Sequence, residues 1–428
     1  LQNASLWKTK FAKDWGQSGM SFSEWREVRL GDVCTYASTK VSVSEVSEDN
    51  YISTENMLPN KSGVTKSSGL PTVGSVTKYS AGNVLVSNIR PYFRKIWYAD
   101  RDGGCSNDVL VFDINDSKTL DSKFLFYCLS NDVFFDYVMA GSKGTKMPRG
   151  DKGAIMKYPV LLPSLPEQKA IAATLSALDD MIELNNQINK TLEEMAQAIF
   201  KSWFVDFEPF KDGESEESEI GLIPKGWKIV ELEEICSIQN GFAFKSSDYQ
   251  DTGCRLIRTT NITSNGYVNN NDIKFLPQSF YESEKYKNYR FECFDTVLVM
   301  VGASIGKIGL ITEYNLPSLQ NQNMWRFRAN NREISSVYIH YVVRRVNEFV
   351  SNWATGSARD FYRKESFQRA KCVLPPKNVM KEFRLLTDSL FIQISSNIME
   401  NALLLEIRDI LLPKLMSGEI RVPVEEVV

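Results

Sequence analysis

The stretch PEQKAIAATLSALDDMIELNNQINKTLEEMAQAIFKSWFVDFEPF, Pro166 to Phe210, determines how the rest of the chain is organised. Alternating steps of four and three residues from Ile171 trace a seam that is apolar at both ends and polar in the middle. The seam positions are Ile171, Leu175, Leu178, Ile182, Asn185, Asn189, Leu192, Ala196, Ile199 and Trp203. This spacing predicts a long helix that packs against another helix. Leu184, Ile188 and Met195 widen the apolar face and predict that the helix buries more than a narrow two-stranded seam.

A second stretch near the end of the chain, Lys377 to Leu412, repeats the same rhythm. Its seam positions are Phe383, Leu386, Leu390, Gln393, Asn397, Leu404, Ile407 and Leu411, so its centre is also polar. Because a large segment separates the two stretches, antiparallel pairing needs the shorter connection, and we expect an antiparallel coiled coil. At about 1.5 Å per residue over about 40 residues, each helix would run roughly 60 Å. The alternative is that each helix packs only on its own globular core.

Composition is ordinary for a soluble globular protein, with 43% hydrophobic and 24% charged residues. A chain of 428 residues is long enough for two or three domains. No run of about 18 apolar residues occurs, so we expect no membrane span. The seven cysteines are scattered without C-x-x-C spacing, which argues against a disulfide framework or a zinc site and predicts a cytosolic protein. Residues 1–19, which precede Met20, are interpreted as a tag or an upstream extension.

The net charge of −3 is unevenly distributed along the chain. Residues 164–220 carry −9, whereas residues 20–163 carry +1 and residues 221–376 carry +5. The acidity therefore belongs to the first long helix and to the segment DGESEESE, Asp212 to Glu219. The two larger segments are neutral to basic, which permits binding to a polyanion without by itself indicating it.

The chain runs through the same order of elements twice. The matched phrases are WREVRLGDVCTYAS from Trp25 with WKIVELEEICSIQNG from Trp227, I-S-T-E-N from Ile52 with I-R-T-T-N from Ile257, and N-V-L-V from Asn83 with T-V-L-V from Thr296. In both halves a helical stretch, a polar loop and an apolar strand ending in Leu-Pro then precede the long helix. Such a repeat indicates a duplication, and two similar surfaces at a fixed spacing would suit a bipartite ligand.

We therefore predict a mixed α/β (α+β) protein with an internal pseudo-twofold repeat, in which two similar globular domains are separated by two long helices forming an antiparallel coiled coil. The expected segments are 1–19 for the extension, 20–163 for the first globular domain, 164–211 for the first long helix, 212–220 for an acidic linker, 221–376 for the second globular domain, 377–416 for the second long helix and 417–428 for a C-terminal tail.

At this point the sequence resembles the specificity subunit of type I restriction-modification systems. The resemblance extends over nearly everything from Met20 onward. The segments that carry it are Leu162 to Phe210, IPKGWKIVELEEI (Ile223 to Ile235), NGFAF (Asn240 to Phe244) and RDILLPKLMSGEI (Arg408 to Ile420).

The resemblance implies a non-catalytic DNA-reading subunit with two target recognition domains, each reading one half of a bipartite site in double-stranded DNA, the first domain the 5′ half. It further implies that the helical pair fixes the spacing of the half-sites and docks two methyltransferase (modification) subunits and, through them, restriction subunits. No cofactor, metal or membrane is expected.

DNA affinity needs Lys and Arg on phosphates, and specificity needs side chains that reach base edges. The candidates in the first half are Asn88, Arg90, Arg94, Lys95, Ser142, Lys143, Thr145, Lys146 and Arg149, which lie in a cluster around Tyr92 and in a glycine-rich loop. Asn88 and Arg90 are the expected base readers, and Pro91 predicts an extended backbone at Arg90. The alternatives are a solvated loop whose glycines make turns, and a structural salt bridge at Arg90.

The candidates in the second half are Arg258, Thr259, Asn261, Ser304, Lys307, Ser357, Arg359, Arg363 and Lys364. The first three are also typical of a strand end with turn-capping residues. Partner docking is expected along Ile171 to Phe207 and Phe383 to Met416, with Phe200, Trp203, Phe204 and Phe207 as anchors, because large aromatics dominate interface energetics. Those four aromatics could instead complete an intramolecular core.

An enzyme in this functional class would be a methyltransferase or a nuclease. No G-x-G tripeptide occurs, which removes the usual glycine turn for adenosylmethionine or a dinucleotide. His340 is the only histidine and lies in the helix-like run VYIHYVV, a placement more typical of packing than of catalysis. We therefore expect no catalytic activity. The alternative function is an assembly scaffold that binds proteins without sequence-specific DNA binding.

Overall fold

The computed structural model describes residues 24–72, 74–144, 146–353 and 362–423. The chain divides into two compact units, of which unit 1 comprises Leu1–Met181 with Leu404–Val428, and unit 2 comprises Ile182–Leu403. The division passes through both long helices, α6 (Leu165–Phe204) and α11 (Lys377–Ser417). Each compact unit therefore includes part of each long helix.

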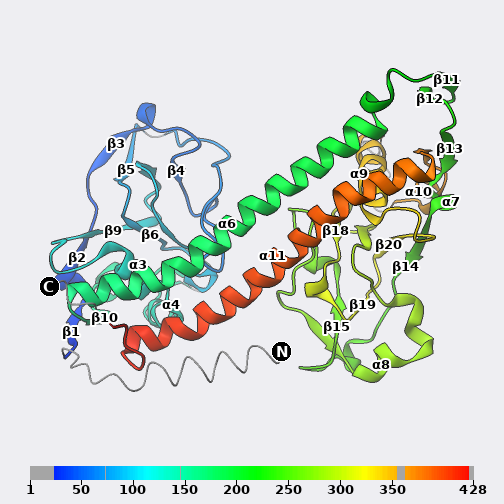
Figure 1. The fold of residues 1–428 in the computed structure, drawn as a ribbon. Coiled ribbons are helices and arrows are strands. Elements are labelled where there is room, and N and C mark those ends of the chain that lie inside the picture. The colour runs from blue at the N-terminus through cyan, green and yellow to red at the C-terminus, as the bar shows by residue number, and fades with distance from the viewer. Residues whose placement is uncertain (1–23, 73, 145, 354–361, 424–428) are drawn as a thin grey trace. The chain divides into compact units, whose positions relative to one another are not determined.

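Unit 1 is a mixed α/β body with mostly antiparallel strands (Figure 1). Its strands are β1 (Arg26–Arg29), β2 (Cys34–Tyr36), β3 (Lys40–Ser42), β4 (Tyr51–Ile52), β5 (Ser75–Tyr79), β6 (Val84–Ser87), β7 (Ile96–Tyr98), β8 (Gly103–Cys105), β9 (Val109–Ile114) and β10 (Pro159–Leu162). Its shorter helices are α2 (Leu30–Val33), α3 (Ser122–Ser130), α4 (Asp132–Ala140) and α5 (Lys152–Ile155), with the 3-10 turn η2 (Pro91–Phe93). The sheet orders are β2-β9-β6-β7, β3-β5-β8-β4 and β1-β10.

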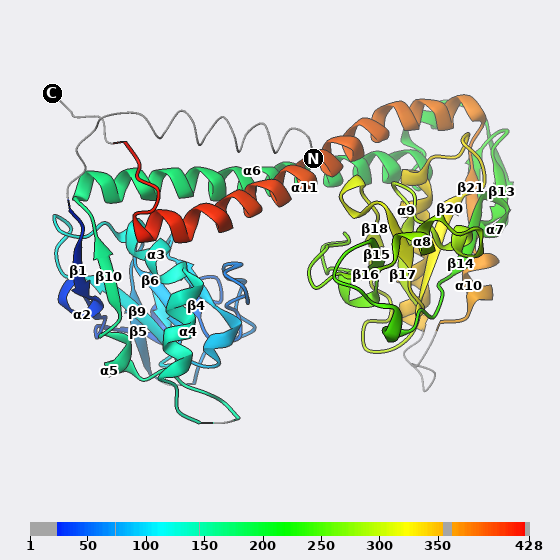
Figure 2. The ribbon, with the colours of Figure 1, turned by 90° about the horizontal axis from the view of Figure 1, so that it is seen from below.

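The core of unit 1 forms where the apolar strands β6 and β9 meet α3 and α4. All four residues of β6 are buried, as a strand covered on both faces requires. Figure 2 shows α3 and α4 beside these strands. Asn131 separates the two helices, because its extended backbone ends α3 while its side chain accepts a hydrogen bond from Val133 N at the start of α4.

Unit 2 repeats this plan with its own strands and one longer helix (Figure 2). Its strands are β11 (Ser215–Ser218), β12 (Gly221–Pro224), β13 (Lys228–Glu231), β14 (Cys236–Asn240), β15 (Cys254–Ile257), β16 (Lys274–Leu276), β17 (Thr296–Val299), β18 (Ile308–Leu310), β19 (Ser318–Gln320), β20 (Met324–Ala329) and β21 (Lys371–Leu374). Its shorter helices are α7 (Leu232–Ile235), α8 (Gln278–Glu282), α9 (Ser336–Trp353) and α10 (Lys364–Gln368). The sheet orders are β14-β20-β17-β18, β16-β15-β19, β13-β21 and β11-β12.

The internal repeat is confirmed by strand register. Cys34 pairs with Ile114 in unit 1, and Cys236 pairs with Ala329 at the same position of the corresponding sheet. Val84 faces Phe112, and Thr296 faces Phe327. The register therefore matches Val84 with Thr296, one residue beyond the Asn83 match expected from the sequence.

The pairing of α6 with α11 is antiparallel in each unit. In unit 2, Asn185 Nδ2 donates to Asn401 Oδ1 at 2.9 Å, and Asn397 Nδ2 donates to Asn189 Oδ1 at 2.8 Å. In unit 1, Arg408 donates to Asp179 at 2.9 Å. Residue numbers along α11 decrease as those along α6 increase, so the two helices run antiparallel, as the sequence predicted.

The seam of α6 was predicted with the correct phase, and that of α11 in part, since Phe383 and Asn397 are buried as expected. Asn185 and Asn189 are buried at the polar centre, as the spacing required. On α11 the predicted seam residues Leu386 and Gln393 are exposed, whereas Thr387 and Asn401 are buried. Polar residues at true seam positions and leucines outside them caused the error.

Two further expectations differ from the structure. The long helix expected to continue to Phe210 ends at Phe204, and Phe207 then adopts a left-handed backbone with φ of 53° before the 3-10 turn Glu208–Phe210. The predicted acidic linker contributes to an antiparallel hairpin, in which β11 pairs with β12.

Candidate nucleic-acid interface

The two candidate clusters of unit 1 are brought together at the end of β6. Arg149 forms bridges with both Lys143 and Ile89, which makes the loop a hairpin laid against the strand end. Arg90 N donates to Pro148 O at 2.8 Å, and Gly150 N donates to Asn88 O at 3.2 Å. A Cβ at Gly150 would lie 2.8 Å from Asn88 Oδ1, so this close approach favours glycine. We call residues 88–95, 140–144 and 146–152 the hairpin surface.

Three of the seven cations of the hairpin surface are paired with carboxylates. Lys143 Nζ lies 2.7 Å from Asp151, which holds the pKa of that carboxyl at about 2, first through their hydrogen bond. Arg149 pairs with Asp108 at 3.2 Å, and Arg94 with Asp132 at 2.8 Å. Exposed pairs of this kind contribute only about 0–1 kcal/mol, so a DNA phosphate can replace the carboxylate at little cost.

The remaining polar candidates of the hairpin surface differ in whether their side chains already have hydrogen-bond partners within the protein. Lys95 Nζ donates to Thr54 O at 2.6 Å, and burial lowers its pKa. Ser142 Oγ donates to Met139 O at 2.8 Å. Lys146 is exposed and forms no hydrogen bond or ion pair with a described residue. Thr145 lies outside the described residues.

The expected base readers Asn88 and Arg90 are less free than the sequence suggested. Asn88 is buried, and its Oδ1 has no hydrogen-bond partner among described residues. Arg90 has φ of 49° and ψ of 61°, a left-handed conformation rather than the extended one predicted from Pro91. Such a backbone costs about 1–3 kcal/mol and persists only when its surroundings fix it. Here the hydrogen bond to Pro148 O and the buried ring of Pro91 hold the turn.

An exposed aromatic pair lies on this strained turn. Tyr92 is 47% exposed and Phe93 is 37% exposed, with ring centroids 4.6 Å apart. Arg94, at the end of η2, also has a left-handed backbone with φ of 51°. Asn60 N and Lys61 N donate to the carbonyls of Phe93 and Arg94, which anchors the turn from outside. The sequence pattern placed Tyr92 in this cluster but did not indicate the exposure of either ring.

In unit 2 the corresponding elements meet in the same way. Tyr362 N donates to Met300 O at 2.9 Å, which joins the segment before α10 to the end of β17. Lys307 is exposed and lines a cleft of about 670 Å³ with His340 and Arg344. Ser304 O accepts from Lys307 N within the same turn.

The other candidates of this part of unit 2 have mixed outcomes. Arg363 is exposed immediately before α10, and Lys364 is half-buried at its first position. Ser357 and Arg359 lie outside the described residues.

Arg258, Thr259 and Asn261 form the turn that was the alternative interpretation of their sequence. Asn261 is fully buried, and its Oδ1 accepts from Arg258 N at 3.0 Å. The Arg258 guanidinium pairs with Asp272 at 3.0 Å. Asn56 accepts from Ser53 N in the equivalent turn of unit 1, so the shared asparagine is explained by backbone structure.

The aromatic ending of α6 fills the core of unit 2. Phe200 and Phe204 are each 5% exposed, and both rings contact Tyr338 and Phe383. Trp203 and Phe207 are half-buried and pack against the same core. Phe200 and Phe204 therefore complete an intramolecular core, which was the alternative to partner docking.

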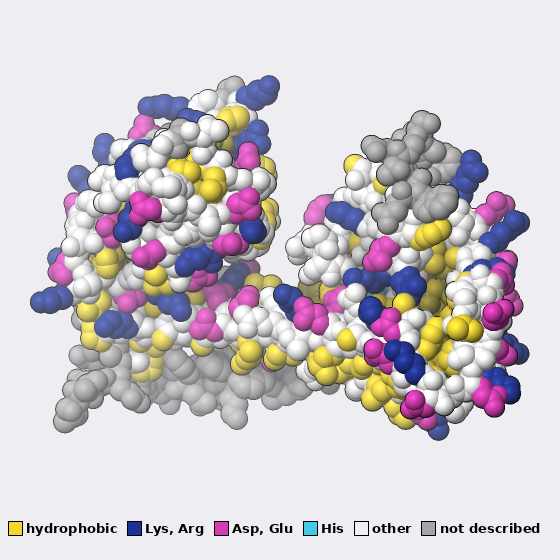
Figure 3. Space-filling model, turned by 90° about the horizontal axis from the view of Figure 1, so that it is seen from above, with side chains coloured by type: hydrophobic (Ala, Val, Ile, Leu, Met, Phe, Trp, Pro, Cys, Tyr) yellow, Lys and Arg dark blue, Asp and Glu magenta, His cyan; other side chains and the backbone are white. Residues whose placement is uncertain are grey.

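The apolar residues that were expected to widen the seam are instead on the surface, so that prediction was wrong. Leu184, Ile188 and Met195 are exposed on α6. The exposed set on α11 within unit 2 is Leu385, Leu386, Ile392, Met399 and Leu403. Figure 3 shows hydrophobic side chains on the helix surfaces. We call these eight residues the exposed apolar stripes.

Within the described ranges, no group of three or more His, Cys, Asp or Glu side chains could hold a metal ion. Over the same part of the chain, no helix is long and apolar enough to cross a membrane.

A sequence model of the family described as type I restriction modification DNA specificity domain matches residues 22–194 and 224–383. The chain belongs to this family, since the two matches together cover most of its length. The family description is of a DNA specificity domain, and not of a methyltransferase or nuclease.

Particular relatives are similar over long stretches. The chain is 25% identical, over an alignment of 467 residues, to the specificity subunit of the type I restriction enzyme HindI of Haemophilus influenzae, with 93% of this chain and 100% of that protein covered. It is 27% identical over 339 residues to the MjaVIII specificity subunit of Methanocaldococcus jannaschii, covering 75% and 74%. The S subunit structure from M. genitalium, 16% identical, shares the fold with a TM-score of 0.59 over 94% of this chain and 98% of that one.

Proposed function

We propose that the chain is the non-catalytic DNA-reading subunit of a type I restriction-modification complex. The globular parts, residues 20–163 and 221–376, each read one half of a bipartite double-stranded target. The methyltransferase and endonuclease activities belong to partner subunits. The proposal places the complex in the cytoplasm, where its DNA is accessible.

The main support for this proposal is that, in each unit, two segments come together at the end of one strand. In unit 1 the hairpin surface joins the end of β6, and in unit 2 the segment before α10 joins the end of β17. Both places carry exposed lysines, Lys146 and Lys307, that can contact phosphates. The two copies of the family match support one DNA-contacting unit in each half.

The helical pair is proposed to dock two methyltransferase subunits and, through them, restriction subunits, and to set the spacing of the half-sites. The exposed apolar stripes are the proposed docking surface, in place of the buried Phe200 and Phe204. Leu385, Ile392 and Met399 recur every seven residues, a spacing that suits a partner helix. Burying such side chains on association is favourable by roughly 25 cal/mol per Å² of apolar area.

Mapping of methylated adenines across a genome tests the proposal. Cells that carry this chain with its cognate methyltransferase subunit are compared with cells that carry the methyltransferase subunit alone. The expected result is a split motif, two short half-sites around a fixed spacer, found only when this chain is present. Identical methylation in both strains would contradict DNA reading and favour the assembly scaffold.

A further inference from the structure

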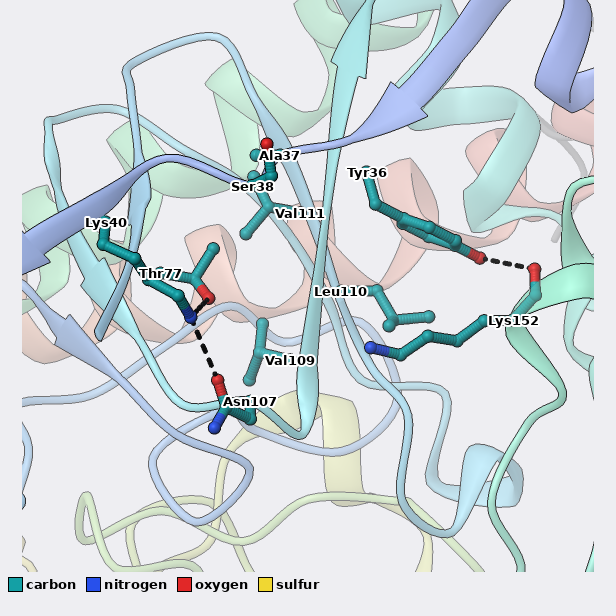
Figure 4. A pocket seen from close by; sticks show the side chains of 10 residues that line it. All are labelled: Tyr36, Ala37, Ser38, Lys40, Thr77, Asn107, Val109, Leu110, Val111 and Lys152. Atoms are coloured by element: carbon teal, nitrogen blue, oxygen red, sulfur yellow. Dashed lines mark hydrogen bonds between the residues drawn. The ribbon is translucent and has the colours of Figure 1, made fainter. Parts of the chain in front are cut away.

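A cleft of about 300 Å³ opens in unit 1 at the edge of the hairpin surface, which contributes Lys152 to its lining. Its floor is formed by Val109, Leu110 and Val111 of β9, and lysines stand on either side of it (Figure 4). Lys40 enters from β3 and Lys152 from the start of α5. The volume is at the low end of the range for small-ligand sites, roughly 300–1,000 Å³.

Neutral groups hold the Lys40 ammonium in this cleft. Lys40 Nζ donates to Thr77 Oγ1 at 3.0 Å and to Asn107 Oδ1 at 3.4 Å. These oxygens orient the ammonium without cancelling its charge. An ammonium has three donors, so one donor is left for a further acceptor.

Lys152 is held from the opposite side by Tyr36. The Tyr36 hydroxyl donates to Lys152 O at 3.1 Å, and Lys152 Nζ lies 6.0 Å from the centre of the Tyr36 ring. Burial raises the pKa of the Tyr36 phenol, so it stays neutral. Figure 4 shows the Lys152 side chain extending toward the middle of the cleft.

The cleft differs from the rest of the hairpin surface in its charge balance. None of the described residues that line it is acidic, and neither lysine forms an ion pair with a described residue. Asp151 adjoins Lys152 in sequence, but its side chain is occupied by Lys143 and by the amides of Gly153 and Ala154. Both ammonium groups can therefore bind an anion that enters the cleft, because no acidic side chain among the described lining residues competes for them.

The cleft is continuous with the hairpin surface through one short segment. Asn107 lines the cleft, while its neighbour Asp108 pairs with Arg149 and its carbonyl accepts from Asn88 N at 2.8 Å. We propose that Lys40 and Lys152 bind one backbone phosphate of the DNA whose half-site unit 1 reads, an inference that rests on the proposed function. The site contributes affinity and position but no sequence preference.

The test measures dissociation constants of the complex of this chain with its methyltransferase subunits, for a duplex carrying the methylated motif and for a random duplex, over a range of salt concentrations. The variant is Lys40→Gln with Lys152→Gln. The matched control is Lys66→Gln, which removes an exposed lysine already placed beside Glu48 and Asp49. A second variant, Lys40→Arg with Lys152→Arg, keeps both charges, and thermal denaturation verifies that every variant is folded.

The glutamine variant is expected to weaken binding to both duplexes by a similar factor. The slope of log Kd against log salt concentration should fall by about 1, as for one lost phosphate contact, with the motif unchanged. The arginine variant and the Lys66 control should match the wild type. A glutamine variant with the wild-type slope would overturn the phosphate site while leaving DNA reading intact.

Two other outcomes separate the alternatives. Inorganic phosphate that stabilises the wild-type complex but not the glutamine variant, together with an unchanged DNA slope, would assign the cleft to a free anion and overturn the DNA contact. A wild-type complex that prefers neither duplex and shows no salt-dependent binding would overturn both the cleft proposal and the proposed function.

Discussion

Asn185 Nδ2 donates hydrogen bonds to Asn401 Oδ1 and to a carboxylate oxygen of Glu400, each at 2.9 Å. Asn401 in turn donates to Asn186 Oδ1 at 3.0 Å. A buried amide network of this kind is satisfied in only one alignment of the two helices. Apolar seam residues, by contrast, tolerate shifts of register. The network therefore fixes the alignment of α6 with α11 inside unit 2.

Replacing one member of this pair should destabilise unit 2 more than replacing both. Asn401→Leu leaves the Asn185 amide without one of its acceptors, and an unsatisfied buried polar group costs about 1–3 kcal/mol. Asn185→Leu with Asn401→Leu removes both partners and should recover much of that loss. Urea denaturation of the two single variants and the double variant measures the coupling free energy. Additive effects would contradict a cooperative pair.

His340 should contribute to the loss of stability of the folded protein at acidic pH. Burial first, and the charge of Arg344 second, lower its pKa from 6.5 to about 3. Its Nδ1 lies 3.1 Å from Thr296 Oγ1 in the core. The unfolded chain binds a proton below about pH 6.5 that the folded chain excludes down to about pH 3. The free energy of unfolding should therefore fall as the pH drops through this window, by up to about 1.4 kcal/mol per pH unit.

Nuclear magnetic resonance checks this directly, because His340 is the only histidine of the chain. Its ring resonance should stay in the neutral position from pH 7 to pH 5. His340→Asn, which cannot gain the proton, should show a flatter loss of stability over that range. A resonance that titrates near pH 6.5 in the folded protein would refute the assignment.

Substitutions in the exposed apolar stripes should weaken assembly with the methyltransferase subunit while leaving the stability of the isolated chain almost unchanged. Changing Leu184, Ile188 and Met195 to Gln should alter the free energy of unfolding of the isolated chain by less than about 1 kcal/mol, because these side chains are exposed. Copurification with the methyltransferase subunit should be lost or strongly reduced. The control replaces Glu183, Gln187 and Glu194 of the same helix by Ala. Equal copurification of both variants would remove this face of α6 from the interface.

The α6 seam could be predicted from the spacing of its residues, whereas the α11 seam could be predicted only in part. Leu386 fits the same rhythm as Phe383 but lies on the exposed side, and the seam uses Thr387 and Asn401 instead. Apolar character marks a face as hydrophobic without telling which partner covers it. Leu184, Ile188 and Met195 were assigned to a buried face for the same reason.

The DNA-contact candidates show a second limit of the sequence. Glycines and basic residues predicted two separate clusters in unit 1, and the structure brings these two segments together. The carboxylates that neutralise them, Asp108 for Arg149 and Asp132 for Arg94, lie 41 and 38 residues away in sequence. Lys40 lacked a basic neighbourhood in the sequence and acquires one only through folding. Pairing across such separations is decided by strand register, which local pattern does not specify.

The hairpin surface predicts opposite effects for two substitutions. Lys146→Gln with Arg149→Gln should weaken binding to any duplex and reduce the salt slope by about 1–2, since two phosphate contacts are lost. Asp108→Asn removes the carboxylate that competes for Arg149 and should strengthen binding to random DNA. Filter binding over a range of salt concentrations measures both. Weaker binding by Asp108→Asn would show that the Arg149 pair is structural.

The aromatic pair predicts a loss of sequence preference in one half-site. Tyr92 and Phe93 are exposed on a turn fixed by left-handed residues at both ends, so their rings can contact bases without an ordering cost. Apolar side chains contact the thymine methyl group in the major groove, and a good base contact is worth about 1–3 kcal/mol of discrimination. Tyr92→Ala with Phe93→Ala should therefore weaken binding to the methylated motif by about 1–3 kcal/mol while binding to a random duplex changes little. The control Val133→Ala trims another exposed apolar side chain of unit 1. Equal loss for both duplexes would instead assign the pair to the stability of the turn.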